Sequence, residues 1–319
     1  MYFCRDFKDT TMKRQWIIMA LLLMAGVCVK AQTKETFPFA ERDSTLYLDV
    51  HKPAVPRADK AAVLAVFGGG FVMGTRDNQY QQLLADSLTQ RGFTVISIDY
   101  RLGLKDTVMV KEHSSLLKTS DLFQYCIDIA TEDCADAVAW VCSHAEQLDI
   151  DTSRLILTGS SAGAITILQL DYCRANDLPL AKALPKGWKP AALISYSGGI
   201  MCKKRDLHYA TAPAPTLLMH GTIDRIVDYK KFGLPFSAKL FGSNTIDKVM
   251  DKEDIPHWII RFEGIGHEVA AWFPGSVDLF CCFAQLALDG RESTLDATMT
   301  DAHLKPTKWS KMGLFDIYK

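Results

Sequence analysis

The feature that most constrains this chain is a turn of small residues between two apolar stretches. Residues 159–163 read Gly-Ser-Ser-Ala-Gly, the apolar run 154–158 precedes them, and the helical pattern 164–168 follows. A β-branched run, a G-x-S-x-G turn and a helical stretch are typical of a strand and a helix joined so tightly that the middle serine is exposed. The pentapeptide alone also fits an ordinary loop, but its flanking pattern predicts Ser161 as a nucleophile at the end of a buried strand.

Strand and helix patterns alternate along the rest of the chain. A continuous apolar run lies at 61–67, and mainly apolar stretches of strand length lie at 93–99, 191–196, 215–220 and 258–262. Helical patterns lie at 80–91, 133–147 and 275–288. This alternation predicts an α/β fold with a mostly parallel sheet and helices on both faces. Residues 45–50 alternate apolar and polar side chains, so we expect them to form an edge strand.

The connections indicate one domain with little or no cap. The stretches 104–131 and 229–256 are longer than a crossover needs, and they fit either substrate walls or plain surface helices. Only residues 197–214 separate two neighbouring strands, which leaves little room for a large cap. We expect a domain at 32–290, followed by a polar tail at 291–319.

The N-terminus has the pattern of an export signal. Lys13 and Arg14 precede an apolar run from Trp16 to Val29, which is shorter than the roughly 20 residues of a permanent membrane helix. We therefore expect residues 1–31 to be a signal peptide, with Met12 as an alternative start, and the mature protein to be periplasmic or extracellular without a stable membrane span. Cys28 leaves lipoprotein anchoring as a less favoured alternative.

Charge and cysteine content exclude several classes of protein. Without residues 1–31 the chain keeps 31 basic and 35 acidic side chains, so it is mildly acidic and no nucleic-acid partner is expected. Its seven remaining cysteines show no C-x-x-C spacing, which excludes the usual zinc and redox motifs, and we expect neither a metal nor a cofactor. Export would permit a disulfide among Cys126, Cys134 and Cys142, although a chain of this size does not need one.

A serine nucleophile needs a base and an acid that orients the base, and both follow in the sequence. Asp224 comes just after the strand at 215–220, and His267 just after the strand at 258–262. Ser161, Asp224 and His267 would thus lie in loops at the carboxyl ends of three strands, where such sheets bind substrates. Asp228 is an alternative acid, and His220 is assigned to the turn.

The glycines at 68–70 offer the donors that a tetrahedral oxyanion requires. They directly follow the buried run 61–67, and without side chains their backbone can approach a reacting carbonyl. The sequence therefore predicts an oxyanion hole formed by the amides of Gly69, Gly70 and Ala162, while a flexible glycine loop is the alternative interpretation.

Taken together, these motifs resemble those of the α/β-hydrolases, in particular the esterase and lipase branch with a Gly-Gly-Gly oxyanion loop. The resemblance covers about residues 45–290 and is carried by five segments: Phe-Gly-Gly-Gly-Phe at 67–71, Asp-Tyr-Arg-Leu-Gly at 99–103, the turn at 159–163, His-Gly-Thr-Ile-Asp at 220–224 and Gly-His-Glu at 266–268. It implies an eight-stranded sheet and hydrolysis of carboxylic esters without a cofactor. Phe67 replaces the family's histidine, which is thought to brace the loop, and Ala164 replaces a frequent glycine.

The leading hypothesis is a secreted serine hydrolase that cleaves carboxylic esters through an acyl-enzyme. Exported relatives with little cap often act on acetyl or feruloyl groups of polysaccharides, so a small-molecule or carbohydrate ester is the expected substrate class. A serine peptidase of the same fold is the alternative, and a noncatalytic ligand-binding protein is a third. The sequence leaves the oligomeric state open.

Overall fold

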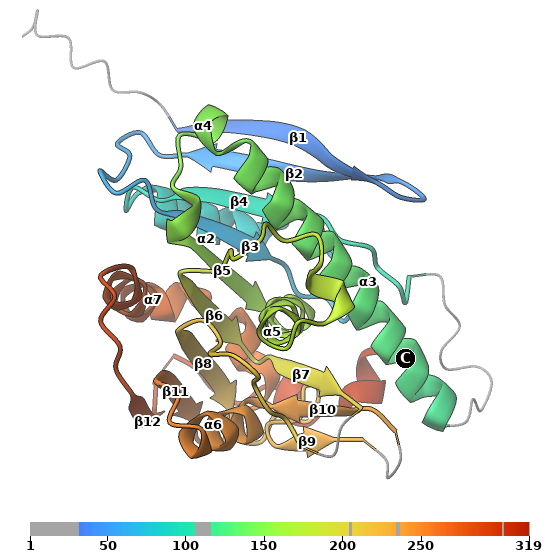
Figure 1. Cartoon of the computed structure of the whole chain (residues 1–319). Helices are drawn as coiled ribbons and strands as arrows, with labels where there is room; N and C mark the ends of the chain where they lie inside the picture. The colour runs from blue at the N-terminus through green and yellow to red at the C-terminus, as the bar shows by residue number, and fades with distance from the viewer. Residues whose placement is uncertain (1–31, 106–115, 204–205, 234–236, 302, 319) are drawn as a thin grey trace, which may run out of the picture. The chain divides into compact units, whose positions relative to one another are not determined.

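In the computed structural model, a nine-stranded mixed sheet forms the centre of the unit at residues 32–319 (Figure 1). The structure describes residues 32–105, 116–203, 206–233, 237–301 and 303–318. The strands, in the order in which they lie side by side, are β1 (Thr33–Glu41), β2 (Thr45–Lys52), β4 (Thr94–Ile98), β3 (Ala62–Val66), β5 (Leu155–Ser160), β6 (Ala192–Tyr196), β8 (Thr216–Gly221), β11 (His257–Phe262) and β12 (Leu295–Met299). The predicted signal peptide, with Met12 and Cys28, lies outside the described residues.

Most neighbouring strands are parallel, as predicted. From β4 to β12 every pair is parallel, whereas β1–β2 and β2–β4 are antiparallel. The helices are α2 (Gln79–Thr89), α3 (Leu116–Ser143), α4 (Ala145–Leu148), α5 (Ala162–Ala175), α6 (Ser243–Lys252) and α7 (Phe273–Leu288). Because parallel strands run the same way, the loops after β3, β5, β8 and β11 meet at one edge of the sheet.

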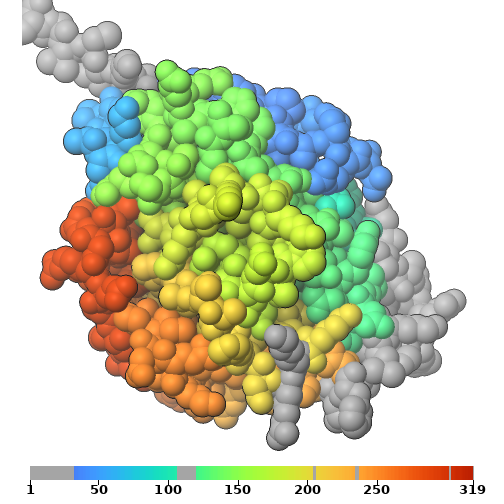
Figure 2. All heavy atoms as spheres, viewed as in Figure 1, coloured from blue at the N-terminus to red at the C-terminus, as the bar shows by residue number. Residues whose placement is uncertain are grey.

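Helices cover both faces of the sheet because its strands are apolar on both faces. In β3, Leu64 and Val66 belong to one buried cluster with residues of α3 and α5, while Val63 and Ala65 belong to the opposite cluster with α2 and α7. Successive side chains of a strand point to opposite faces, so the continuous apolar run 61–67 supplies both cores. The space-filling view shows green to yellow segments covering the first face (Figure 2).

Two predictions about strands are wrong. The strand at 45–50 is not an edge strand, because β1 pairs with β2 along its outer side. The sheet has nine strands and not eight, because part of the predicted tail, residues 295–299, pairs with β11 as β12. The compact unit therefore continues from Gln32 to Lys319 and does not end at residue 290.

The first long connection contains a helix, which is one of the two interpretations that the sequence left open. Much of 104–131 belongs to α3, which begins at Leu116 and contains the helix expected at 133–147 as far as Ser143. Part of 229–256 forms a small antiparallel sheet of β7 (Gly199–Cys202), β10 (Lys239–Gly242) and β9 (Lys231–Phe232). Along the described part of the chain, this small sheet and the C-terminal segment lie beside the central sheet, and no separate cap domain is present.

The three cysteines considered for a disulfide lie on one helix as thiols. Cys126, Cys134 and Cys142 all belong to α3, and burial raises the pKa of Cys126 to about 12 and that of Cys142 to about 11. A thiol with so high a pKa is a poor nucleophile at neutral pH. No helix among the described residues has the length and hydrophobicity that crossing a membrane requires.

Candidate active site

Ser161 lies in a strained turn between β5 and α5. Its φ is 52° and its ψ −117°, a conformation that residues other than glycine seldom adopt. The turn is tight because a Cβ on Gly163 would lie 2.1 Å from the Val66 carbonyl oxygen, and one on Gly159 2.4 Å from the Gly163 backbone. These contacts explain why small residues flank Ser161 and why its side chain points out of the turn.

The structure brings Ser161, His267 and Asp224 together. The Oγ of Ser161 lies 2.8 Å from Nε2 of His267, and Nδ1 of His267 lies 2.7 Å from Oδ2 of Asp224. With the proton on Nδ1, the imidazole donates to Asp224 and accepts from the serine hydroxyl. Ser161 and His267 each keep 9% of their surface exposed, so the reacting end of the arrangement is reachable while Asp224 is buried.

Asp224 is held as a carboxylate by its surroundings. Burial by itself would raise its pKa, but the nearby His267 and the hydrogen bond from His220 outweigh burial and lower the pKa. Its other oxygen, Oδ1, accepts from the amides of Ile226 at 2.9 Å and Val227 at 3.1 Å. An ionised, fixed acid of this kind can hold one tautomer of His267 and stabilise its protonated form.

His220 is a polar neighbour of this group that sequence reasoning placed in the turn. It is the last residue but one of β8 and is completely buried. Its Nε2 lies 3.0 Å from the Val227 carbonyl oxygen and 3.3 Å from Oδ2 of Asp224. Its Nδ1 lies 2.7 Å from Oγ of Ser243. A neutral ring with its proton on Nε2 satisfies all these contacts, so His220 braces both Asp224 and the loop that carries it. Its position four residues before Asp224 was the available signal.

The alternative acid, Asp228, lies away from His267. Its Oδ1 accepts from the amides of Lys230 and Lys231, at 2.8 and 2.9 Å, and so caps a turn. After this turn the chain enters β9 at Lys231. Between the two candidates, the geometry favours Asp224.

The predicted oxyanion donors line the same site. Gly69 and Gly70 have positive φ values of 137° and 63°, and cavities that reach Ser161 are lined by Gly69, Gly70 and Ala162. Among the described residues, no acceptor is bonded to the amides of Gly69 and Gly70. Unpaired amides beside a serine hydroxyl are suited to an oxygen that becomes negative.

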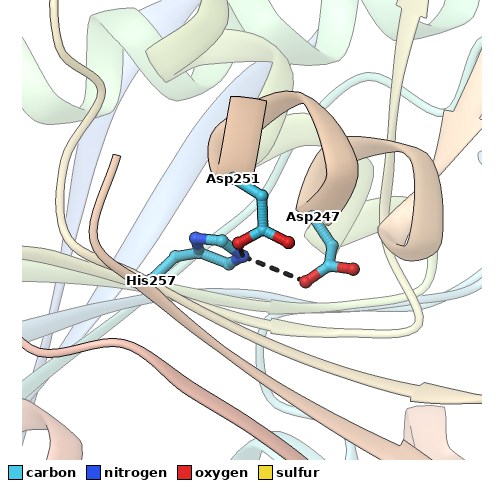
Figure 3. Close-up of side chains that lie close together, drawn as sticks. All are labelled: Asp247, Asp251 and His257. Carbon is cyan, nitrogen blue, oxygen red and sulfur yellow. Dashed lines mark hydrogen bonds and ion pairs between the residues drawn. The ribbon is translucent and has the colours of Figure 1, made fainter. Parts of the chain in front are cut away.

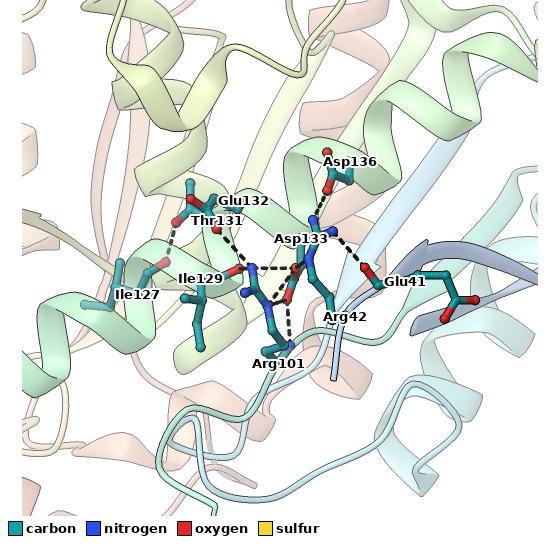
Figure 4. A network of polar contacts seen from close by, with 9 residues as sticks. All are labelled: Glu41, Arg42, Arg101, Ile127, Ile129, Thr131, Glu132, Asp133 and Asp136. Atoms are coloured by element: carbon teal, nitrogen blue, oxygen red, sulfur yellow. Dashed lines mark hydrogen bonds and ion pairs between the residues drawn. The ribbon is translucent and has the colours of Figure 1, made fainter. Parts of the chain in front are cut away.

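The glycine loop is braced without the histidine that Phe67 replaces. Phe67 stacks on Tyr100 with ring centroids 4.4 Å apart, and the Tyr100 hydroxyl donates to the Phe67 carbonyl at 3.0 Å. The adjacent Arg101 fixes this segment to α3, because its amide and its guanidinium both bind the buried Asp133 (Figure 4). Arg42 binds the same carboxylate from the N-terminal hairpin. The segment at 99–103 therefore positions the loop.

Two cavities meet at Ser161. The first, of about 360 Å³, is mainly apolar and includes Phe71, Ile165 and Met201 in its walls. The second, of about 640 Å³, is lined by Met73 and also by His267. Ser161 and Gly70 line both cavities, which places the nucleophile and the glycine loop where they join.

The described residues include one group with metal-binding side chains, which lies between α6 and β11. Asp247, Asp251 and His257 place their ligand atoms near one another (Figure 3). However, Nδ1 of His257 lies 2.8 Å from the Ile255 carbonyl, its Nε2 lies 3.0 Å from Asp247, and Arg261 binds the other oxygen of Asp247 at 2.8 Å. These contacts form an ion-pair network that joins α6 to β11.

The fold is similar to that of a solved esterase. The structure of esterase 2 of Thermogutta terrifontis phosphorylated by paraoxon superimposes on this chain with a TM-score of 0.56 at 18% identity. The superposition covers 81% of this chain and 95% of the esterase chain. The chain therefore has the α/β-hydrolase fold.

Sequence comparison agrees with this fold class. The model of the carboxylesterase family matches residues 24–178. An ethyl acetate hydrolase of Pseudomonas putida is 26% identical over 61% of this chain and 60% of its own length. Esterase LipI of Mycobacterium tuberculosis is 33% identical over 46% of this chain and 39% of its own length. The chain spans between 20% and 60% of the length of the curated relatives it matches. The chain thus has the α/β-hydrolase fold, and the sequence relatives that it matches are esterases and lipases.

Proposed function

We propose that this protein is a carboxylic ester hydrolase that acts through Ser161, His267 and Asp224. The observation that carries the proposal is the unbroken set of contacts from Ser161 Oγ through His267 to Asp224. A serine hydroxyl becomes an effective nucleophile when an oriented base removes its proton. The esterase relatives support an ester as the substrate.

The proposed reaction begins when His267 Nε2 takes the proton of Ser161 as the serine oxygen bonds to the ester carbonyl carbon. The negative carbonyl oxygen accepts from the amides of Gly69, Gly70 and Ala162, and the imidazolium is stabilised by Asp224. His267 then gives its proton to the departing alkoxide, which leaves as the alcohol. Water then attacks the acyl carbonyl carbon while His267 takes its proton. The bond between the acyl group and Ser161 breaks, His267 returns the proton to the serine oxygen, and the acid leaves.

The position of His267 assigns a role to each cavity. The leaving alcohol must lie near Nε2 of His267 to receive its proton, and only the second of the two cavities is lined by this residue. The alcohol group therefore occupies the cavity of about 640 Å³, and the acyl group occupies the apolar cavity of about 360 Å³.

Labelling by an organophosphate tests the nucleophile. Paraoxon should stop hydrolysis of short-chain p-nitrophenyl esters and add a diethyl phosphoryl group to the tryptic peptide of residues 155–174. That peptide also contains Ser160, whose hydroxyl donates to the Ala270 carbonyl, so Ser160→Ala is the matched control. Ser161→Ala should lose the label and up to about a million-fold in turnover, whereas Ser160→Ala should keep the label. Activity that survives Ser161→Ala would refute the proposal.

A substrate panel separates the esterase from its alternatives. Acetyl, butyryl, octanoyl and feruloyl esters, acetylated polysaccharide and dipeptide amides should be compared by kcat/KM. We expect esters to be preferred, with acylated carbohydrate among the substrates. Faster turnover of dipeptide amides would favour a serine peptidase, and binding of an acylated ligand without turnover would favour a noncatalytic protein.

We further propose that residues 1–31 direct export to the periplasm or beyond the cell. The support is the basic pair at 13–14, the short apolar run after it and the small residue Ala31. The mature protein recovered from its producing cells should begin at Gln32 by mass spectrometry. An intact N-terminus would contradict export by cleavage, and a lipid-sized mass on Cys28 would indicate anchoring.

A further inference from the structure

The last described residues of the chain, 307–318, lie over the site and are called here the C-terminal strap. The strap follows β12 and is attached first to the loop of His267. The carboxylate of Glu268, the residue after His267, accepts from the amide of Thr307 at 2.6 Å and from the amide of Ser310 at 2.9 Å. The hydroxyls of Thr307 and Ser310 donate to it as well.

The strap also contacts the other two loops of the site. The amide of Leu314 donates to the carbonyl of Arg225, the residue after Asp224, at 3.0 Å. The hydroxyl of Tyr318 donates to the Gly70 carbonyl at 2.9 Å. One continuous segment thus touches the acid loop, the base loop and the glycine loop, so its position relative to Ser161 is fixed by hydrogen bonds at three places.

The strap supplies part of the wall of the apolar cavity. Phe315, Ile317 and Tyr318 line this cavity on one side, and Phe232 of β9 lines it on another. Phe315 and Phe232 meet edge to face with ring centroids 6.3 Å apart, and they keep 40% and 42% of their surfaces exposed. The aromatic pair therefore stands at the rim, where the cavity meets solvent.

We propose that the strap determines acyl specificity, with Phe315 and its partner Phe232 closing the acyl cavity at its rim. This inference rests on the proposed ester hydrolysis, because His267 assigns the apolar cavity to the acyl group. A saturated acyl chain gains free energy for each methylene that it buries, and it stops gaining where the cavity ends. The aromatic pair sets that limit, so the substrates are esters whose acyl chains fit inside it.

Chain-length profiles of rim variants test the proposal. Phe315→Ala should open the rim and raise kcat/KM for dodecanoyl relative to butyryl p-nitrophenyl esters by about tenfold, since two or more further methylenes then become buried. Phe232→Ala should have the same effect from the opposite side. Ile317→Phe, which adds bulk inside the cavity, should shift the preference toward shorter chains.

Leu295→Ala is the matched control. Leu295 lies in β12, near the strap in sequence, is 36% exposed, and lines neither of the two cavities. Its chain-length profile should equal that of the wild type. Circular dichroism should confirm that each variant is folded. If all folded variants keep the wild-type chain-length profile within twofold, the proposed role of the strap is wrong, whereas the proposed ester hydrolysis still stands.

A second measurement does not need turnover. Butyrate, octanoate and dodecanoate should be titrated against each variant while tryptophan fluorescence is followed, because Trp309 belongs to the strap. Tighter binding of dodecanoate relative to butyrate in Phe315→Ala supports the cavity limit, and an unchanged ratio refutes it. A wild type that binds these acids and hydrolyses no ester would instead refute the proposed function.

Discussion

Two regions build the site in different ways. The region from β3 to α5 lies inside the match to the carboxylesterase family and places Ser161 and the glycine loop through tight backbone contacts. The C-terminal strap lies outside that match and reaches the same site through side-chain hydrogen bonds and aromatic contacts. In the first region a side chain larger than hydrogen has no space at Gly159 or Gly163. The strap is held mainly at Glu268, Arg225 and Gly70.

This difference indicates a division of roles. Close backbone packing fixes the positions of Ser161 and of the glycine loop, and the proposed reaction requires reacting groups to be positioned within a fraction of an ångström. The strap touches the reacting residues only indirectly and forms walls, so changes in it should alter stability, loop position or substrate preference more than the chemical step. The following predictions test this division, from the largest effect to the smallest.

The largest effect is expected at the acid. Asp224→Asn should preserve the fold but lower kcat by up to about 10⁴-fold, because an amide cannot hold His267 in the required tautomer or stabilise its charge. Asp228→Asn, which touches only turn amides, is the control and should stay within about twofold of wild type. Steady-state kinetics on p-nitrophenyl butyrate measure both. The reverse result would show that Asp228 is the acid and that the contact between His267 and Asp224 is not the catalytic one.

The attachment of the strap should matter for stability. Glu268→Gln leaves one acceptor oxygen where the carboxylate has two. An amide NH₂ in place of Oε2 would face the Gly266 amide and the Ser310 hydroxyl, which both donate to this oxygen in the wild type. We expect a loss of about 1–3 kcal/mol in the free energy of unfolding, measured by urea denaturation. The strap should also release from the site, so that trypsin cleaves at Lys308 and Lys311 sooner than in wild type.

Glu263→Gln, in the exposed part of the same loop, is the matched control and should change neither stability nor proteolysis. Equal stability and equal cleavage rates for both variants would show that the strap is held by its apolar contacts and not by Glu268.

A smaller effect is expected where the strap meets the glycine loop. Tyr318→Phe removes the hydrogen bond to the Gly70 carbonyl and should lower kcat by about fivefold with little change in KM, because Tyr318 positions the loop without contacting the oxyanion. Tyr125→Phe, at a ring that is 56% exposed, serves as the control. A rise in KM at unchanged kcat would mean that Tyr318 acts only as a cavity wall.

The smallest effect concerns pH and lies away from both regions. Burial would lower the pKa of His257, but hydrogen bonds to Asp247 and the Ile255 carbonyl outweigh burial and raise the pKa above its usual value of 6.5. A raised pKa stabilises the folded state below the unfolded value, and this contribution is lost as pH rises through the folded value. The melting temperature of wild type should therefore exceed that of His257→Gln most at about pH 6, and the difference should narrow toward about pH 9.

A difference that stays constant over this pH range would contradict the ion-pair interpretation of Asp247, Asp251 and His257. Addition of a divalent cation or a chelator provides an independent check. A rise in melting temperature with added zinc that disappears in His257→Gln would indicate a metal site in place of the ion-pair network.

Much of the fold follows from local sequence patterns. The buried strands at 61–67 and 93–99 were predictable because their runs are apolar on both faces and end at glycine or charged residues. The edge position was not predictable, because residues 33–41 become a strand only by pairing with β2. Residues 295–299 alternate apolar and polar side chains, but the stretch is short and lies in a polar tail, and it became recognisable as a strand through its pairing with β11.

By itself, the sequence determined the strained turn at Ser161, the parallel sheet around it and the chain order of Ser161, Asp224 and His267. These depend on local spacing and on residue size, which a linear pattern contains. Only the tertiary structure brought Asp224 and not Asp228 to His267, turned His220 inward against Asp224, and carried the strap across the site. Those outcomes depend on which loops meet when distant strands pair, and such long-range contacts leave no periodic signal in the chain.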